Sequence, residues 1–388
     1  MDIRKEAEQI EEDVIRFRRD LHQYPELSGH EVMTTEYIRE HLEKWEISYR
    51  LLEPTGVIGV IGSGRNTIAL RADMDALKIR EETDLPFHSQ NTECMHACGH
   101  DGHTAILLAA AKILKEHEKE LDRRIMLVFQ PAEEIAQGAA DILGTGILDQ
   151  ADRIFGLHIF SGIEKGKISL EPGPRMASTN WFSIRIAGRS GHAGKPHECA
   201  DAGIAAAALV MNLQTIISRN VNPLDDAVLT IGRLEAGTAR NVIAGEAVLE
   251  GTVRTFSKEV QDEIQKRMEE MTEATALMYQ VEVSLDFQQA SHPALVNNHT
   301  AVMEAARKAK EVFKAKDFVH VPPMMLGEDF ANYLREIIYV FLTIFLYLLK
   351  CPQSLILSAL RAFCFCGKPH ISRSIFLYFR YQAWLKSW

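Results

Sequence analysis

Apolar residues recur at helical spacing through the first 45 residues of the chain. Within residues 3–23 they fall every three or four positions, which predicts one amphipathic helix. The residues at this spacing are Ile10, Val14, Phe17 and Leu21. The segment YPELSGHE then breaks the pattern with a proline and a glycine. A second helix is predicted over residues 31–45.

Short β-branched runs alternate with helical ones as far as about residue 175. The runs that predict strands are GVIGVIG, TIALRADMD, RRIMLVFQPAEE and RIFGLHIF, and HTAILLAAAKILKEH predicts a helix between the second and third. Strands that alternate with helices favour a largely parallel sheet covered by helices. The expected fold class is therefore α/β, with three layers.

The pattern changes after residue 175. The predicted order strand, helix, strand, strand, helix, strand is that of a ferredoxin-like (β-α-β-β-α-β) unit. The segment PPMMLGEDFANYL and the helix predicted before it are consistent with a return of the chain to the α/β layer. We expect a domain made of residues 1–175 and 291–336, interrupted by an inserted ferredoxin-like domain at residues 176–290.

Residues 337–388 form a tail of different character. They contain six Lys and Arg but no Asp or Glu, so the negative net charge lies wholly in the first 336 residues. The apolar run IIYVFLTIFLYLL is shorter than the roughly 20 residues that a membrane span needs. We hypothesise a reading-frame change near codon 336, which would give the chain an aberrant hydrophobic tail.

Composition limits the classes of function. A length of 388 residues predicts two or three domains. A net charge of −10 without a basic cluster disfavours nucleic-acid binding, so a small molecule or another protein is the expected partner. The charged start MDIRKEAEQIEED is unlike a secretory signal, and six cysteines are too few for a disulfide scaffold. We expect a cytoplasmic protein with no membrane partner.

Groups that can bind metal or move protons gather where the predicted strands end. Such groups are Asp73 and Asp75, Glu133 and Glu134, His158, and the turn that carries Cys98 and His100. In an open α/β sheet, ligands bind beyond the carboxyl ends of the strands. This convergence is the strongest functional signal in the sequence.

Each of these groups also has a structural interpretation. Cys98 and His100 have a C-x-H spacing that can aim both side chains at one metal ion, but Cys98 can equally be a buried thiol. Cys94 and Cys98 lack the C-x2-C spacing of a redox pair. Glu133 and Glu134 can divide metal binding and proton transfer, or begin a solvated helix. His158 can be a core histidine.

Two glycine-rich segments in the predicted inserted domain carry further polar groups. GRSGHAGKPH holds His192 and His197, and GTARNVIAGEA holds Arg240 and Asn241. Such loops can bind an oxyanion or a carboxylate, although ordinary turns have the same composition.

Taken together, these motifs resemble the aminoacylase/carboxypeptidase family of metallopeptidases. The matching segments are RRDLHQYPELS, ALRADMDALKI, HACGHDGHTAILLAAAK, VFQPAEE, GLHI, SGHAGKPH, TARNVIAGEA, GTVRTF and LGEDFANYL, in this order. They resemble most the N-acyl-amino-acid amidohydrolase branch, which includes hippurate hydrolases, auxin-conjugate hydrolases and N-acetyl-diaminopimelate deacetylases. The resemblance covers residues 16 to about 335.

The resemblance implies metal-dependent hydrolysis of the amide bond of N-acyl amino acids, and it implies roles for single residues. The implied metal ligands are Cys98, His100, Glu134 and His158. The implied general base is Glu133, the implied oxyanion stabiliser across a homodimer is His192, and the implied carboxylate binders are Asn241 and, less strongly, Arg254. Two divalent ions (manganese, zinc, cobalt or nickel) and a lid and dimerisation role for the inserted domain also follow.

Several points stay open. The family has a last metal-binding histidine near the C-terminus, and His370 in the tail does not match it. We therefore expect one weakened metal site, apolar surface exposed by loss of the last strand and helix, and impaired activity. His103 is expected to support a helix, and His96 and Asp101 to lie behind the ligands. A non-catalytic binder remains an alternative, and so does a dipeptidase or exopeptidase, which is disfavoured because Arg71 lies near the position of a peptidase ligand.

Overall fold

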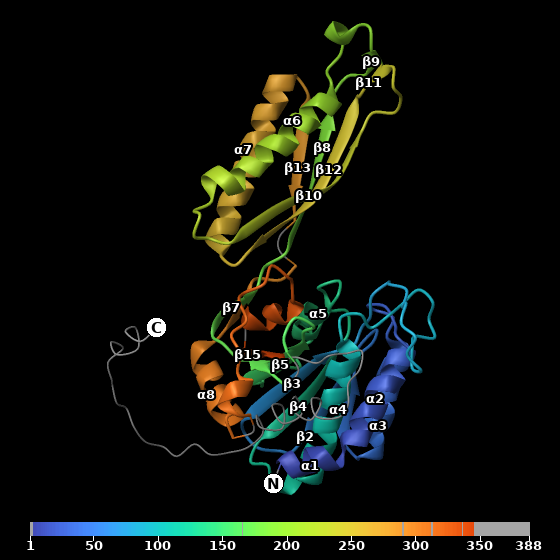
Figure 1. Cartoon of the computed structure of the whole chain (residues 1–388), viewed down its shortest axis with the longest axis vertical. Coiled ribbons are helices and arrows are strands. Elements are labelled where there is room, and N and C mark those ends of the chain that lie inside the picture. The colour runs from blue at the N-terminus through green and yellow to red at the C-terminus, as the bar shows by residue number, and fades with distance from the viewer. Residues whose placement is uncertain (1–2, 165, 289–290, 312, 336, 345–388) are drawn as a thin grey trace, which may run out of the picture.

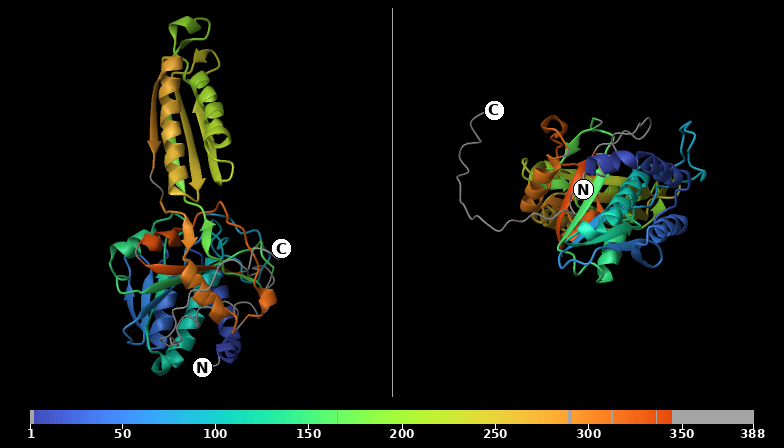
Figure 2. Two further views of the ribbon diagram at one scale, coloured as in Figure 1. Left: turned by 90° about the vertical axis from the view of Figure 1, so that its left-hand side faces the viewer. Right: turned by 90° about the horizontal axis from the view of Figure 1, so that it is seen from below.

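The computed structural model describes residues 3–164, 166–288, 291–311, 313–335 and 337–344. These residues form two units that lie one above the other along the long axis of the molecule (Figure 1). The lower unit contains a seven-stranded sheet, and the upper unit, residues 180–287, contains a four-stranded sheet. The left view of Figure 2 shows the same separation after a quarter turn about the vertical axis.

The seven-stranded sheet is mixed, and its centre is parallel. Its strands, in spatial order, are β1 (Ser48–Leu51), β2 (Val57–Ile61), β4 (Arg124–Gln130), β3 (Thr67–Asp73), β5 (Arg153–Ile159), β15 (Ile338–Ile344) and β6 (Ile168–Ser169). The pairs β4 with β3, β3 with β5 and β5 with β15 are parallel. The carboxyl ends of these four strands therefore lie at one edge, as expected for a ligand-binding α/β sheet.

Helices cover both faces of this sheet. The helices of the lower unit are α1 (Ile3–Gln9), α2 (Glu11–Gln23), α3 (Val32–Lys44), α4 (His100–Glu116), α5 (Gly138–Gly144) and α8 (His299–Ala309), with short 3-10 turns η1 (Glu118–Glu120), η4 (Ala315–Asp317) and η5 (Asp329–Arg335). One apolar core packs α1, α2, α3, α4 and α8 against one face of the sheet. A second apolar core packs α5 and η5 against the other face. The predicted three-layer α/β fold is confirmed.

Strand β3 shows how the sequence builds these layers. All seven of its residues are buried, because the sheet is covered on both sides. Leu70 and Ala72 belong to the core under α4, whereas Ala69 belongs to the core under α5 and η5. Side chains alternate along a strand, so Arg71 faces the same side as Ala69.

The upper unit is an antiparallel sheet with two helices on one face (Figure 1). The strands are β10 (Ala227–Ala236), β12 (Glu246–Thr255), β8 (Asn180–Ala187) and β13 (Glu282–Phe287), in this spatial order. The helices are α6 (Ala202–Thr215), followed by a π turn η3 (Ile216–Asn220), and α7 (Lys258–Tyr279). Two small ladders pair β9 (Gly191–His192) with β11 (Val242–Ile243) and β7 (Gly173–Met176) with β14 (Leu295–Asn297). A short 3-10 turn, η2, covers Pro196–Glu198.

One helical segment within the described residues, Ala202–Asn220, is long and apolar enough by length and composition to cross a membrane. Its buried side chains, which include Ala205, Leu209 and Leu213, form the core of the upper unit with the four-stranded sheet. Length and composition therefore have a structural explanation here, because the core helix of a folded unit passes the same test.

Three of the differences between the structure and the sequence prediction concern where predicted elements begin, break or end. The first predicted helix is split at Ile10 into α1 and α2. Helix α4 begins at His100 rather than at His103. Residues 338–344, which the sequence places in the aberrant tail, form β15 beside β5, so the expected loss of the last strand does not hold for them. Residues 345–388, with His370, lie outside the described residues.

Candidate active site

The candidate site lies at the carboxyl ends of β3, β4 and β5 and at the start of α4. Gly99 precedes α4 with a φ of 99°, a left-handed conformation that favours glycine. This turn places Cys98 and His100 on the same side of the site. Cys98, His100 and His158 have ligand atoms within 4.8 Å of one another, and so do His100, Glu133 and Glu134.

His158 presents one ring nitrogen to the thiol of Cys98. Its Nδ1 donates to the carbonyl oxygen of Ile159 at 2.7 Å, so Nε2 carries the lone pair of the neutral ring. This Nε2 lies 3.4 Å from Cys98 Sγ. Burial, together with His103, lowers the pKa of His158 to about 3, so the ring is neutral at physiological pH.

His100 is fixed in the same way by Asp75. Its Nδ1 lies 3.0 Å from the carbonyl oxygen and 3.1 Å from Oδ1 of Asp75, and both oxygens can only accept. Nε2 therefore points away, 4.0 Å from Glu133 Oε2 and 3.9 Å from Glu134 Oε1. A ligating histidine is held by such a hydrogen bond at its other nitrogen.

Asp75 also places Glu134. Its Oδ2 accepts from the Glu134 N–H at 3.0 Å and from Ser28 Oγ at 2.6 Å. The carboxylate of Glu133 instead accepts from the Asp329 N–H at 3.3 Å. The two adjacent glutamates are therefore held from different sides, which suits different tasks for them.

The site carries more negative charge than its protein cations balance. Burial raises the pKa of Glu133 well above its usual range, and the nearby carboxylates of Glu328 and Asp329 raise it further. Burial also raises the pKa of Glu134 and of the Cys98 thiol. For His100, burial acts to lower the pKa, but the Asp73 carboxylate and the Cys98 sulfur outweigh it and hold the pKa well above 6.5.

A divalent cation fits these residues. His100 Nε2 and Glu134 Oε1 are buried and have no hydrogen-bond partner among the described residues, which is costly unless something else satisfies them. Sulfur, imidazole nitrogen and carboxylate oxygen are the donors that zinc and similar metals accept. A cation would also neutralise the surplus charge. The types of donor atom and the two buried atoms without a partner both favour a bound divalent cation.

Other histidines of the HACGHDGH segment stand behind these groups. His103 Nδ1 bonds Asp73 Oδ1 at 2.5 Å, and its Nε2 accepts from the Ile159 N–H at 2.8 Å. Asp101 accepts from His22 Nδ1 at 2.8 Å and from Arg18 Nε at 3.1 Å. His96 is buried, and neither of its ring nitrogens has a hydrogen-bond partner among the described residues.

Comparison with known proteins identifies the family. The profile described as peptidase family M20/M25/M40 matches residues 69–348. The chain belongs to this family. The predicted resemblance to the aminoacylase/carboxypeptidase metallopeptidases is thereby confirmed.

Curated M20 relatives match most of the chain. It is 42% identical to the N-acetyl-L-cysteine deacetylase of Bacillus subtilis over 334 residues. This alignment covers 84% of this chain and 79% of the deacetylase. It is 37% identical over 329 residues to an IAA-amino acid hydrolase of Arabidopsis thaliana, with 84% and 75% covered. It is 37% identical over 336 residues to the N-acetyldiaminopimelate deacetylase of Priestia megaterium, with 84% and 88% covered.

Solved M20 structures match the whole architecture. An aminohydrolase from methicillin-resistant Staphylococcus aureus superposes with a TM-score of 0.86 at 31% identity, covering 94% of this chain and 97% of that one. A dinuclear metal-binding peptidase of the M20 family from Bacillus subtilis superposes with a TM-score of 0.80 at 35% identity, covering 92% and 97%.

The predicted substrate-binding residues of this M20 chain lie in the upper unit, at two separate places. His192 and the segment that follows Asn241 pair in the β9–β11 ladder at the far tip of the unit (Figure 1). The side chains of His192 and Asn241 are exposed. Arg254 lies near the opposite end of β12, where its Nη1 donates to Thr179 Oγ1 at 3.0 Å. The structure places the ladder that carries His192 and adjoins Asn241 away from the carboxyl end of β4, which Glu133 follows, within one chain (Figure 1).

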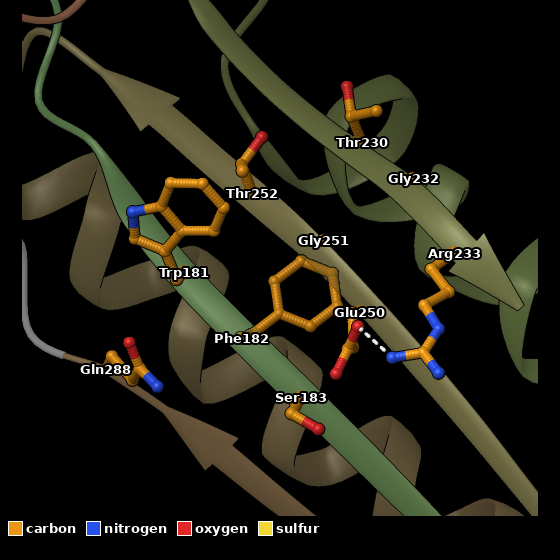
Figure 3. A pocket seen from close by; sticks show the side chains of 10 residues that line it. All are labelled: Trp181, Phe182, Ser183, Thr230, Gly232, Arg233, Glu250, Gly251, Thr252 and Gln288. Carbon is orange, nitrogen blue, oxygen red and sulfur yellow. Dashed lines mark hydrogen bonds and ion pairs between the residues drawn. The ribbon is translucent and has the colours of Figure 1, made fainter. Parts of the chain in front are cut away.

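A hollow on the free face of the four-stranded sheet has a volume of about 440 Å³ (Figure 3). Gly232 and Gly251 leave room there between the indole of Trp181 and the ion pair of Arg233 with Glu250. Its lining contains none of the predicted ligands or catalytic groups. The hollow is therefore distinct from the candidate active site.

Sequence reasoning gave no role to three buried residues that border the site. Glu328 and Asp329 were noted only within the LGEDFANYL motif, and Arg71 only as a mark of the branch. Glu133, Glu328 and Asp329 have carboxylate oxygens within 4.8 Å of one another. The available signal was Arg71, a charged residue in the middle of the largely apolar run TIALRA.

Proposed function

We propose that this chain hydrolyses the amide bond of N-acyl amino acids and releases a carboxylic acid and a free amino acid. The observation that carries this proposal is the cluster of Cys98, His100, Glu134 and His158 beside Glu133 at the carboxyl edge of the sheet. Relatives named as deacetylases and amino acid hydrolases support it.

Cys98, His100, Glu134 and His158 would hold the metal, and the relative described as dinuclear supports two ions, of manganese, zinc, cobalt or nickel. Bound divalent ions supply Lewis acidity, which makes water a stronger acid and the acyl carbonyl a better electrophile. The chelating groups are held by Asp75 and Ile159, so they need little rearrangement on binding.

In the proposed mechanism Glu133 moves the protons. Its carboxylate takes a proton from the attacking water and later gives it to the departing amine. Burial and neighbouring carboxylates raise its pKa, which matches a group that must both accept and return a proton near neutral pH. His192 would stabilise the oxyanion from a neighbouring subunit, and Asn241, with Arg254 as the weaker candidate, would hold the substrate carboxylate.

The proposal includes a cytoplasmic homodimer in which residues 176–290 serve as lid and dimerisation domain. The position of His192 supports this part, because it is exposed at the tip of the upper unit, away from Glu133 of the same chain (Figure 1). The domain limits proposed from the sequence are residues 1–175 and 291–336 for the catalytic domain and 337–388 for the altered tail, and the pairing of β15 with β5 extends the catalytic domain to residue 344.

A substrate panel tests the proposed function. The purified full chain, with its metal content measured, is assayed on N-acetyl and N-benzoyl amino acids with and without a chelator. We expect release of free amino acid that stops on chelation and returns when a divalent metal is added. Turnover that a chelator does not change would contradict the metal-dependent mechanism, and ligand binding without turnover would favour a non-catalytic binder.

A further inference from the structure

Arg71 is a fully buried cation in the centre of the sheet. Its Nη1 donates to Asp73 Oδ2 at 2.7 Å, and its Nε donates to Gln130 Oε1 at 2.8 Å. Its Nη2 donates to Asp329 Oδ1 at 2.9 Å and lies 3.1 Å from Glu328 Oε1. A buried charge needs such partners to be tolerated. Arg71 therefore joins β3 and β4 to the segment that follows the upper unit.

The carboxylate of Asp329 is the most constrained member of this group. Gln130 Nε2 donates to both of its oxygens at 2.8 Å, and the Ala139 N–H donates to Oδ2 at 2.9 Å. With Arg71, three donors from β3, β4 and α5 converge on one side chain that has no exposed surface. Because the side chain is fixed from three elements, the main chain at residue 329 is fixed with it.

The main chain at this position touches the proposed general base. The Asp329 N–H donates to Glu133 Oε1 at 3.3 Å across 196 positions of sequence. Among the described residues, this amide is the hydrogen-bond donor of the Glu133 carboxylate. The other oxygen, Oε2, lies on the side of His100 Nε2. The amide thus fixes which oxygen of Glu133 faces the ligand cluster.

We propose that Asp329 is a positioning residue for Glu133. Its buried carboxylate holds its own N–H where that N–H orients the Glu133 carboxylate, so that Oε2 faces the reacting water. The inference rests on the proposed function for the role of Glu133, and the contact itself does not depend on that role. Small misplacements of a catalytic group cost turnover rather than substrate binding.

The variant Asp329→Asn tests this role. An amide NH2 in place of Oδ2 would face the donors of Gln130 and Ala139, so the side chain and its N–H must shift. On an N-acetyl amino acid we expect kcat to fall by about 10- to 100-fold. We expect KM to stay within about twofold and the metal content to stay unchanged.

Tyr333→Phe is the matched control. The Tyr333 hydroxyl donates to Gln130 Oε1 at 3.0 Å, so this variant removes one buried hydrogen bond of the same group without touching Asp329. We expect it to lower the melting temperature while kcat stays within about twofold of the wild type. An equal loss of kcat in both variants would show that general damage to the core, and not the position of Glu133, causes the effect.

A double-mutant cycle with Glu133→Asp separates positioning from a structural role. The shorter side chain moves the carboxylate away from the Asp329 amide, so Asp329→Asn should change kcat by less than about twofold in this background. Effects that multiply in the double variant would overturn the proposal.

Amide hydrogen exchange measures the hydrogen bond between the Asp329 amide and Glu133 without an activity assay. In the full chain, we expect the Asp329 amide to exchange about tenfold faster in Glu133→Ala than in the wild type, because its acceptor is removed. If the wild type shows no turnover, the proposed function fails. The exchange rates still show whether the Asp329 amide is hydrogen-bonded to Glu133. Equal exchange in the two proteins would overturn the proposal.

Discussion

At the scale of single residues, the site depends on side chains that orient the candidate metal ligands through hydrogen bonds. Asp75 is the clearest case, because one oxygen accepts from His100 and the other from Ser28 and Glu134. An asparagine at this position can serve only one of these sides, since its NH2 cannot accept. Asp75 should therefore matter for metal affinity although it is not a proposed ligand.

For Asp75→Asn we expect the affinity for a divalent metal to fall by about 10- to 100-fold. A competition titration against a chelating dye measures this affinity directly. Ser28→Ala is the control, because it removes one hydrogen bond of Asp75 and leaves both His100 and Glu134 in place. An unchanged affinity in Asp75→Asn would show that His100 needs no such support.

His22 gives the chain a pH-dependent contribution to stability. Burial acts to lower its pKa, but hydrogen bonding and the charges of Asp101 and Glu81 outweigh burial and raise the pKa above 6.5. The stabilisation is therefore complete below the ordinary pKa and is lost as the pH rises through the raised one. The protonated ring can donate to both carboxylates, one from each nitrogen.

We expect the difference in unfolding free energy between the wild type and His22→Asn to be larger at pH 6 than at pH 9. Urea denaturation of the metal-free proteins at both pH values measures it. The exposed His88, whose Nδ1 bonds the Leu85 carbonyl, supplies the control His88→Asn. A difference that grows toward pH 9 would contradict the assigned partners.

The sequence predicted where the candidate groups gather better than it predicted which residues hold them in place. Cys98, His100, Glu133 and His158 sit at strand ends and at a helix start, so their convergence follows from the order of strands and helices. The pairing of Arg71 with Asp329 spans 258 positions and depends on η5 packing against β3, which no local pattern encodes. Which ring nitrogen of His100 stays free depends on Asp75, which is also distant in sequence.

At the scale of elements, periodicity placed most helices and strands but missed those set by tertiary contacts. Among the described strands, the four-residue edge strand β1 pairs with β2 alone. Helix α5 has seven residues, so neither element is long enough to show a period. The start of α4 at His100 follows from the left-handed Gly99 rather than from apolar spacing. The run 338–344 is mostly apolar, as is usual for a strand of a parallel sheet, and it pairs in parallel with β5.

Helix α5 makes a testable close contact at its first residue. A Cβ at Gly138 would lie 1.7 Å from the Pro131 carbonyl oxygen, which is main chain and cannot rotate away. For Gly138→Ala we expect the unfolding free energy to fall by about 1–3 kcal/mol. Urea denaturation measures the loss.

Gly144, the last residue of the same helix, provides the matched control. A Cβ there would meet nothing within 4 Å, so Gly144→Ala should be neutral or stabilise by about 0.5–1 kcal/mol through helix propensity. Equal losses in both variants would contradict the assigned packing of α5.

At the scale of the whole molecule, the end of the chain differs in composition from the rest. The curated relatives align over 329 to 336 residues of the 388, and the tail after residue 336 contains no acidic residue. A frame change predicts that another reading frame of the gene encodes an acidic continuation with a histidine. Sequencing the gene tests this, and the hypothesis fails if neither other frame encodes one.

The same hypothesis predicts lower metal occupancy than two ions per chain and weak turnover, because a histidine ligand would be replaced by unrelated sequence. Full occupancy with normal turnover would contradict it. The amidohydrolase assignment itself does not depend on this result, because it rests on groups within residues 98–158.

The central claim is that Glu133 transfers protons beside a metal held by its neighbours. Turnover of an N-acetyl amino acid by the wild type and by Glu133→Gln, with the metal content of both measured, tests it most directly. We expect the variant to keep the wild-type metal content and to lose about 10²- to 10⁴-fold in kcat. Equal turnover by the two proteins would contradict proton transfer by Glu133.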